Sequence, residues 1–317
     1  MVVAVTAIYF RSNIKPHAAN GMEEADAVGP AALYLPPDTS QIRQSVHAAL
    51  IWYGRELIVN TRKYLGPDGI VKQVSNQLNC QNCHLEAGAK TAAYSANFLG
   101  VAPNYPLYRD RSGMMETIQF RVNDCLLRSM NGKRLDTASR EMKALVAYIL
   151  WLGKDVPSGA KPVNSKIEQL SYLDRAADTI NGKKIYAVKC RLCHGANGYG
   201  GYSIDSALYY PPLWGPGSYN TGAGMYRLSR LAGFVKNNMP FGVNHGESQL
   251  SNEECWDVAA FINSKPRPHK LFPNDWPDLS KKAIDHPFGP YTDGFSEQQH
   301  KYGPFGPIAN ERRKKIN

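Results

Sequence analysis

Two five-residue motifs combine cysteine and histidine at a spacing that could hold a porphyrin. Residues 80–84 read CQNCH and residues 190–194 read CRLCH, and C-x-x-C-H is the signature of covalent c-type haem attachment. Two cysteines three positions apart on a helical turn can reach both vinyl groups of one porphyrin, and the adjacent histidine then ligates the iron. The motifs therefore predict two covalently bound haem c groups. Attachment is expected at Cys80, Cys83, Cys190 and Cys193, with His84 and His194 as axial ligands.

Zinc binding and dithiol redox chemistry are the alternatives for C-x-x-C. A structural zinc site needs four ligands, which both motifs together would have to supply. A dithiol redox site has no use for the histidine that follows each motif. Because haem is joined to C-x-x-C-H outside the cytoplasm, the haem interpretation also predicts the periplasm as the location.

The second half offers a methionine as the other axial ligand of its haem. Met239 lies 45 residues beyond His194, within an Asn-Met-Pro sequence. A thioether in this position raises the haem potential and suits electron transfer. Met225 is the weaker alternative.

The first half has a cysteine at the corresponding position. Cys125 lies 41 residues beyond His84, and a thiolate donates strongly, lowers the potential of the iron and is a nucleophile. Cys125 is therefore predicted to be the distal ligand of the first haem, with Met130 as the alternative. A disulfide with Cys255 is a further alternative, although it would join two different domains.

Basic residues gather in sequence around Cys125. Arginine is the side chain that binds small oxyanions in a bidentate manner, and each charge-assisted hydrogen bond would contribute about 1.5–3 kcal/mol. A cationic pocket beside a cysteine-ligated haem fits a small sulfur oxyanion, whereas a solvated basic face that also pairs with haem propionates is the alternative. The basic residues are Arg109, Arg111, Arg121, Arg128, Lys133 and Arg134, against the acids Asp110, Glu116 and Asp124.

Helical patterns occur in the same order in both halves. Apolar residues at helical spacing precede each motif, at 46–57 and 174–189, and amphipathic segments that open with serine follow at 139–152 and 251–264. In the first closing segment, Met142, Leu145, Val146, Ile149 and Leu150 are expected on one apolar face. Aligning the two closing segments places Cys255 opposite Met142, so Cys255 is predicted to be a buried, inert thiol.

This repeat predicts an all-α fold of two tandem cytochrome c domains with a long linker and an extended C-terminal tail. The expected parts are an export signal or N-terminal extension (1–36), an N-terminal cytochrome c domain with the first haem (37–155), the linker (156–165), a C-terminal cytochrome c domain with the second, electron-transfer haem (166–270) and a tail that wraps the body (271–317).

Composition excludes several classes of protein. With 317 residues, 43% of them hydrophobic, the chain can form two cores without a disulfide framework, despite its six cysteines. The net charge of +10 favours anionic partners. The basic residues form no arm or stripe apart from 311–315, so no nucleic-acid partner is expected. The apolar start, MVVAVTAIYF, is too short to cross a bilayer, and no stable membrane span is expected elsewhere.

The chain resembles the dihaem thiosulfate dehydrogenases of the TsdA type between residues 53 and 305. The most specific match is RVNDCLLRSMNGK, which lies between a C-x-x-C-H and a closing helix. Further matches are YGRELIVNTRKYLGP, CQNCHLEAG, YRDRSG, the NMP of the second ligand loop, and GFSEQQHKYGPF in the tail.

The resemblance implies a function for each half. His84 and Cys125 would ligate the catalytic haem, whereas His194 and Met239 would ligate a relay haem. Some members have a lysine directly before this methionine that can compete for iron. Here the residue is Asn238, and Lys236 is only a distant candidate, so the resemblance does not imply a lysine/methionine exchange. The substrate site would be lined by Arg111, Arg121 and Ser129.

The implied reaction couples two thiosulfates to tetrathionate with release of two electrons, and it is reversible in some members. The electrons would pass to a periplasmic electron-carrier cytochrome or a partner subunit. The sulfur of Cys125 is expected to accept a thiosulfate-derived group, which the second thiosulfate then attacks. The alternatives are a non-catalytic dihaem electron-transfer cytochrome and a dihaem peroxidase, which would need an open distal site.

Overall fold

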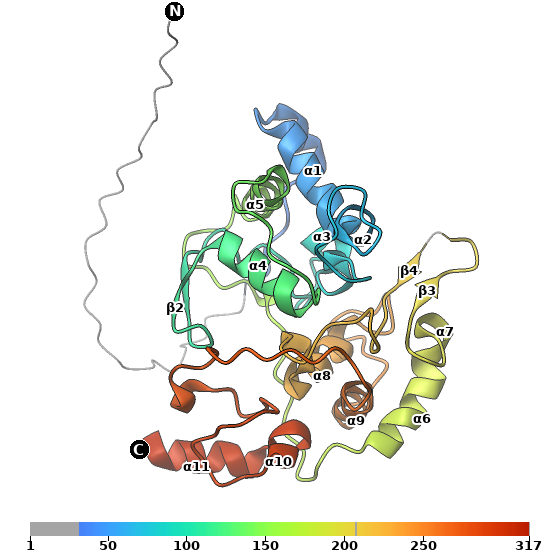
Figure 1. Ribbon diagram of the computed structural model, residues 1–317, viewed down its shortest axis with the longest axis vertical. Helices are drawn as coiled ribbons and strands as arrows, with labels where there is room; N and C mark the ends of the chain where they lie inside the picture. The colour runs from blue at the N-terminus through green and yellow to red at the C-terminus, as the bar shows by residue number, and fades with distance from the viewer. Residues whose placement is uncertain (1–31, 207, 317) are drawn as a thin grey trace, which may run out of the picture. The chain divides into compact units, whose positions relative to one another are not determined.

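The computed structural model describes residues 32–206 and 208–316. Figure 1 shows two helical halves, the first in blue and green and the second in yellow to red. The expected export signal falls largely on residues 1–31, outside the described residues. In the part of the chain that is described, no helix combines the length and apolar character needed to cross a membrane.

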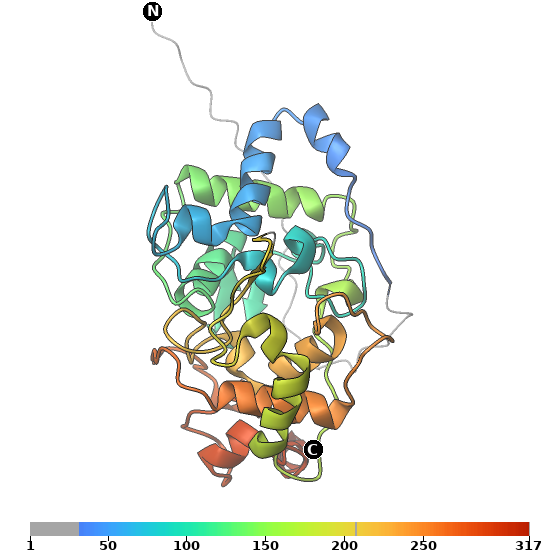
Figure 2. The same ribbon diagram turned by 90° about the vertical axis from the view of Figure 1, so that its right-hand side faces the viewer.

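The first half is built around the crossing of α1 (Ala48–Val59) and α5 (Arg140–Leu152), which is visible in Figure 2. Gly54 lies at the crossing, where an added Cβ would approach the Ala144 carbonyl oxygen to 2.0 Å. The other elements of this half are η1 (Thr39–Gln44), α2 (Thr61–Leu65), η2 (Cys80–Asn82), α3 (Leu85–Gly88), β1 (Leu107–Arg109), β2 (Met114–Glu116), α4 (Ile118–Arg128) and η3 (Val163–Ser165).

The second half repeats this arrangement with α6 (Thr179–Lys189) and α9 (Asn252–Asn263). Gly182 takes the place of Gly54, since its Cβ would lie 2.0 Å from the Asp257 carbonyl oxygen. The other elements are α7 (Arg191–His194), β3 (Gly201–Tyr202), β4 (Tyr209–Tyr210), η4 (Gly224–Tyr226), α8 (Leu228–Asn238), η5 (Leu279–Lys281), α10 (Glu297–Tyr302) and α11 (Gly306–Ile316).

The predicted all-α class is confirmed. The strands are short and form two antiparallel hairpins, β1 with β2 and β3 with β4. Each half has its own apolar core. The closing helices align as expected, because a Cβ added to Gly54 would lie 2.8 Å from Tyr148 Cβ and one added to Gly182 would lie 2.9 Å from Phe261 Cβ.

Helix capping follows the sequence prediction at both closing helices. The Ser139 hydroxyl accepts a hydrogen bond from Met142 N, and Ser251 forms a capping box with Glu254. Cys255 is fully buried and free, and Cys125 is free as well. The buried thiol is thus confirmed, and its burial raises the pKa of Cys255 to about 12.

Several helix boundaries and faces differ from the prediction. The helix expected from residue 174 begins at Thr179, because the Asp178 carboxylate caps Ile180 N and Asn181 N. Val46 precedes α1 and is exposed. On α5, Leu150 is also exposed and faces away from the core. The tail expected to be extended ends in α10 and α11. Phe305, in the connection between them, and Ile308 on α11 contribute to the second core.

Candidate active site

The first haem motif is fastened to the end of α1. The Thr61 hydroxyl donates to Leu57 O at 2.7 Å and accepts from Cys80 N at 3.0 Å. Asn79 then caps the short helix η2 through a reciprocal pair with Asn82. These contacts orient the two cysteines of the motif before any group is attached to them.

Both motif histidines have the same tautomer. His84 Nδ1 donates to Ala96 O at 2.5 Å, and His194 Nδ1 donates to Pro211 O at 3.0 Å, since a carbonyl oxygen can only accept. Burial lowers the pKa of His84 to about 4 and also lowers the pKa of His194. Each Nε2 therefore has a free lone pair, which is the form of histidine that ligates a metal.

These features fit a c-type haem in each half. Every C-x-x-C-H histidine is oriented by a backbone carbonyl, as metal-ligating histidines usually are. By contrast, within residues 32–206 and 208–316 no three His, Cys, Asp or Glu side chains gather to hold a metal ion. A zinc site assembled from both motifs would require such a group, so the donor set favours haem over zinc.

Cys125 on α4 lies within electrostatic range of the first motif. Burial raises the pKa of Cys80 to about 11 and that of Cys83 to about 12, and a negative charge on Cys125 raises both. The same charge is the main cause of the raised pKa of Arg121, which also lies close enough to His84 to lower its pKa. Four predicted site residues line one small cleft. They are Cys125, Arg111, Arg121 and Ser129, and the rest of the lining comes from Asp124, Arg128 and Gly224.

Three arginines of this cleft share one carboxylate. Asp124 Oδ2 pairs with Arg111 and, at 2.8 Å, with Arg121 Nη1, while Asp124 Oδ1 pairs with Arg128 Nε. Burial alone would raise the pKa of Asp124, but the three guanidinium groups outweigh it and hold that pKa below its usual range. Burial lowers the pKa of Arg111 to about 10, so this arginine is still charged near neutral pH.

The wall of the cleft includes a segment far away in the sequence. Arg128 forms a bidentate pair with Asp275 at 2.6 and 2.7 Å and stacks on the Phe272 ring at 3.6 Å. Trp276 N donates to Arg111 O at 2.7 Å. Residues 272–276, which lie between α9 and η5 of the second half, thereby hold two of the cleft arginines in place.

Sequence reasoning missed Asp124, Asp275 and Phe272 as site residues. Asp124 could have been predicted from the sequence. It is three positions after Arg121 and four before Arg128 on one helix, and side chains at these spacings lie next to each other. Asp275 is 147 residues from Arg128, and no local pattern connects them.

The alternative sulfur ligands occupy different surroundings. Met130 is buried in the first core, whereas Cys125 lines the cleft. Met239 directly follows α8 and packs against the second core, and Met225 contacts both cores from η4. Lys236 Nζ donates to Leu250 O at 2.8 Å.

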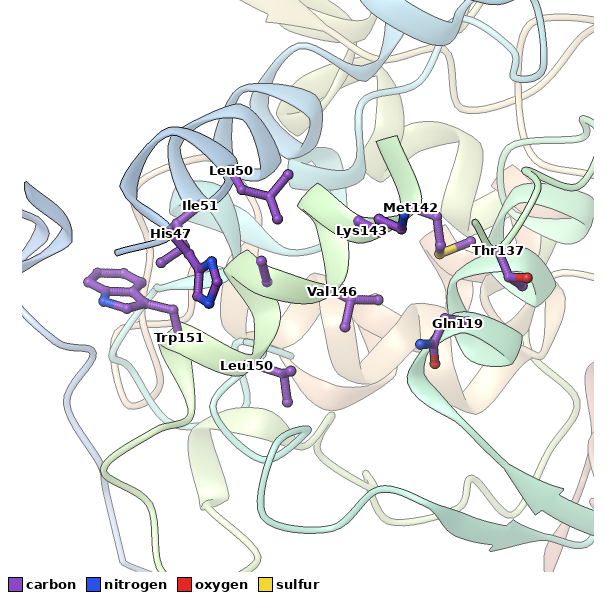
Figure 3. Close-up of a pocket in the computed structure, with 11 residues that line it drawn as sticks. His47, Leu50, Ile51, Gln119, Thr137, Met142, Lys143, Val146, Leu150 and Trp151 are labelled. Carbon is purple, nitrogen blue, oxygen red and sulfur yellow. The ribbon is translucent and has the colours of Figure 1, made fainter. Parts of the chain in front are cut away.

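A larger pocket of about 530 Å³ lies between α1 and α5 (Figure 3). Apolar side chains such as Leu50, Ile51 and Val146 supply most of its lining, and Figure 3 shows His47 and Lys143 among them. It contains none of the predicted site residues, so the chemistry is assigned to the smaller cleft.

Comparison with known proteins agrees with this geometry. Residues 71–157 match the family described as SoxA/TsdA, cytochrome c domain, and residues 180–265 match the family described as Cytochrome c. A thiosulfate dehydrogenase of Psychrobacter arcticus is 40% identical over 76% of this chain and 71% of that protein. One from Allochromatium vinosum is 38% identical over 81% of this chain and 97% of that protein.

A solved structure, the thiosulfate dehydrogenase (TsdBA) from Marichromatium purpuratum in its as-isolated form, matches with a TM-score of 0.66 and 32% identity. The match covers 75% of this chain and 50% of the solved chain, so this protein spans half the length of that relative. Because curated relatives at 38–40% identity align over most of their own length as well, the chain belongs to the TsdA family of thiosulfate dehydrogenases, with two cytochrome c domains.

Proposed function

We propose that this protein is a thiosulfate dehydrogenase that couples two thiosulfates to tetrathionate at Cys125. The observation that carries the proposal is the small cleft in which Cys125 lies beside Arg111, Arg121 and Ser129, within electrostatic range of the first haem motif. An electron-transfer cytochrome needs no such cationic cleft around a ligand.

The residues present fit two haem c groups. The first would be attached at Cys80 and Cys83 and ligated by His84 and Cys125. The second would be attached through the other motif and ligated by His194 and Met239. When bound, these groups supply iron centres that take up electrons one at a time and pass them on.

The arginines bind and orient the substrate. Thiosulfate is a dianion, and two of them repel each other strongly in a site shielded from water. Arg111 and Arg121 each use one edge of the guanidinium group for Asp124, and their other N–H groups can donate to sulfonate oxygens. The Ser129 hydroxyl at the end of α4 adds a neutral donor to the same cleft.

Cys125 supplies the nucleophilic sulfur. In the first step its thiolate forms an S–S bond to the terminal sulfur of one thiosulfate, and the two electrons released leave one at a time to two equivalents of a one-electron acceptor such as a cytochrome. In the second step another thiosulfate attacks the sulfur just bound. The bond to Cys125 breaks, tetrathionate departs and the thiolate is restored, so atoms and charge balance without a proton.

The partners follow from this chemistry. The substrates are thiosulfate and tetrathionate, and the electrons go to a periplasmic electron-carrier cytochrome or a partner subunit. The location is the periplasm, where C-x-x-C-H haem attachment takes place. No nucleic acid is required.

The test compares wild type with Cys125→Met in steady-state thiosulfate oxidation by ferricyanide and in tetrathionate reduction. We expect the variant to keep both haems but to lose at least about a thousandfold in kcat, as is typical when a nucleophile is removed. Cys255→Ala is the control, because it removes a cysteine that belongs to the second core and does not line the cleft, so turnover should be retained.

An inert wild type whose haems are still reduced normally would favour the electron-transfer cytochrome instead. Mass spectrometry of the Cys125 peptide after thiosulfate turnover adds a second readout. A peptide that never carries the added thiosulfate mass would contradict the covalent step.

A further inference from the structure

The segment 90–97, just after the first haem motif, forms a loop whose two ends are joined by hydrogen bonds from its own side chains. The Lys90 carbonyl oxygen accepts hydrogen bonds from Ser95 Oγ at 2.8 Å and Asn97 Nδ2 at 2.9 Å. Between these two residues lies Ala96, whose carbonyl accepts the bond from His84 Nδ1. The segment therefore orients the histidine assigned to the first haem.

The same segment reaches the methionine loop of the second half. Lys90 Nζ donates to Asn238 Oδ1 at 3.2 Å and to Val243 O at 2.9 Å, on either side of Met239 in sequence. Asn238 in turn donates to Tyr94 O at 3.1 Å. The residue directly before Met239 is thus held by the first half at two points.

The ammonium group of Lys90 is buried, and the oxygens that accept its hydrogen bonds are neutral. Burial lowers the pKa of Lys90, and the charge of nearby Glu86 partly offsets this lowering. Lys90 is only 6% exposed, and among the described residues it forms no salt bridge. A buried ammonium is unfavourable unless its donors are satisfied, and here the carbonyl and amide oxygens of the methionine loop satisfy them. Asn238 is fully buried and also donates to Phe234 O at 3.1 Å, so its amide cannot turn away without losing several bonds.

Backbone conformation indicates that the segment is rigid. Tyr94 and Ala96 have φ values of 58° and 54°, which non-glycine residues adopt only where their surroundings enforce it. Hydrogen bonds to η3 and to the residue after it hold both conformations in place. Tyr94 N donates to Val163 O at 3.1 Å, and Ala96 N donates to Lys166 O at 3.2 Å. A rigid segment can transmit the position of one site to the other.

We propose that Lys90 is a positioning residue for Met239, and that segment 90–97 fixes His84 and the Met239 loop relative to each other. Lys90 holds the loop so that the thioether of Met239 is directed to the second haem, and its fixed positive charge favours the reduced form of that haem. This inference rests on the proposed function, because it takes His84 and Met239 as iron ligands.

The test uses the holoprotein with Lys90→Met, which has a side chain of similar length without charge or donors. The first readout is the charge-transfer band of a methionine-ligated ferric haem, and the second is the midpoint potential of each haem in a spectroelectrochemical titration. We expect loss of most of the band and a lowered potential of the second haem, with the haem content and the spectrum of the first haem retained.

Lys236→Met is the matched control. Lys236 lies on α8 close to Met239, but its Nζ donates to Leu250 O and not to segment 90–97. The same charge is removed, and we expect the methionine band to remain. Equal band loss in both variants would overturn the positioning role, because charge alone would then explain it.

The other outcomes are equally decisive. A full band and unchanged potential in Lys90→Met would overturn the inference, and so would a stronger band, because Lys90 would then compete with Met239. If Lys90→Met fails to fold, Asn238→Ala decides, since it removes the contacts to Lys90 and Tyr94 and should weaken the band. A wild type without the band, unchanged by Met239→Leu, would refute Met239 as a ligand and this inference with it, while thiosulfate turnover would still test the reaction separately.

Discussion

Arg121 Nη1 lies 2.8 Å from Asp124 Oδ2, and the two residues occupy the turn of α4 that directly precedes Cys125. The pair sets the direction of the guanidinium group next to the sulfur on which the reaction is proposed to occur. Preorganised donors stabilise developing charge without reorganisation during the reaction. The carboxylate therefore contributes to the site without itself binding an anionic substrate.

Replacement of Arg121 by lysine tests the guanidinium geometry. Arg121→Lys keeps the charge but loses the planar arrangement of donors. A lost charge-assisted hydrogen bond of about 1.5–3 kcal/mol corresponds to a decrease of about 10- to 150-fold in kcat/KM for thiosulfate. Steady-state kinetics check this, with the exposed Arg134→Lys as control. A similar decrease in both variants would mean that only general attraction of anions is involved.

Asp124→Asn tests the shared carboxylate. The variant keeps the size of the side chain but leaves Arg111, Arg121 and Arg128 without the charge that they share. Breaking a buried ion pair costs about 3–5 kcal/mol, and we expect a loss of about 3 kcal/mol because Arg121 is one-third exposed. Denaturant unfolding measures it, and the exposed Asp110→Asn should change the free energy of unfolding by less than about 0.5 kcal/mol. If Asp124→Asn had the same free energy of unfolding as wild type, the network would not stabilise the fold.

The helix crossings predict strong effects of a single methyl group. Gly54→Ala and Gly182→Ala would each bring a Cβ to 2.0 Å from a backbone oxygen of the closing helix, so the helices must move apart. Overpacking of this kind costs about 1–3 kcal/mol, and thermal unfolding should show lower midpoints for both. Gly306→Ala is the control, since nothing lies within 4 Å of its added Cβ. Equal midpoints in all three variants would contradict the close crossings.

Asp285 predicts a specific loss of stability in acid. It accepts from Arg227 Nε at 2.7 Å and from Ser229 N at 3.0 Å. Burial would raise the pKa of Asp285, but these partners lower it below its usual range. The stabilisation is therefore fully present above the unfolded pKa of about 3.9 and is lost as the pH falls through the lower folded pKa.

We expect Asp285→Asn to be less stable than wild type from pH 7 down to about pH 5, with the difference shrinking towards zero below about pH 4. Urea unfolding across this range measures the difference. The exposed Asp155→Asn should differ little from wild type at every pH. A difference between Asp285→Asn and wild type that grows in acid would have the wrong sign for a lowered pKa.

The features predicted well from sequence are those that depend on neighbouring residues. A C-x-x-C-H lies on one helical turn, so its spacing alone places two thiols and an imidazole together. The closing helices could also be predicted, because serine caps and the spacing of apolar residues are local features of the sequence. The predicted start of α6 was wrong because Asp178, four residues after Asp174, caps the helix. The helical end of the tail was not predicted because α11 is mostly polar and has too few apolar residues to show a helical pattern.

By itself, then, the sequence determined the haem motifs, the helical repeat and Cys125 at the position of a ligand. Only the tertiary structure decided which distant side chains complete the two sites. Asp275 reaches Arg128 across 147 residues, and Lys90 reaches Asn238 across 148. Such pairs form because the packing of the two halves brings distant parts of the backbone together. A buried charged group needs a hydrogen-bond partner, and the tertiary packing decides which residue is near enough to be that partner.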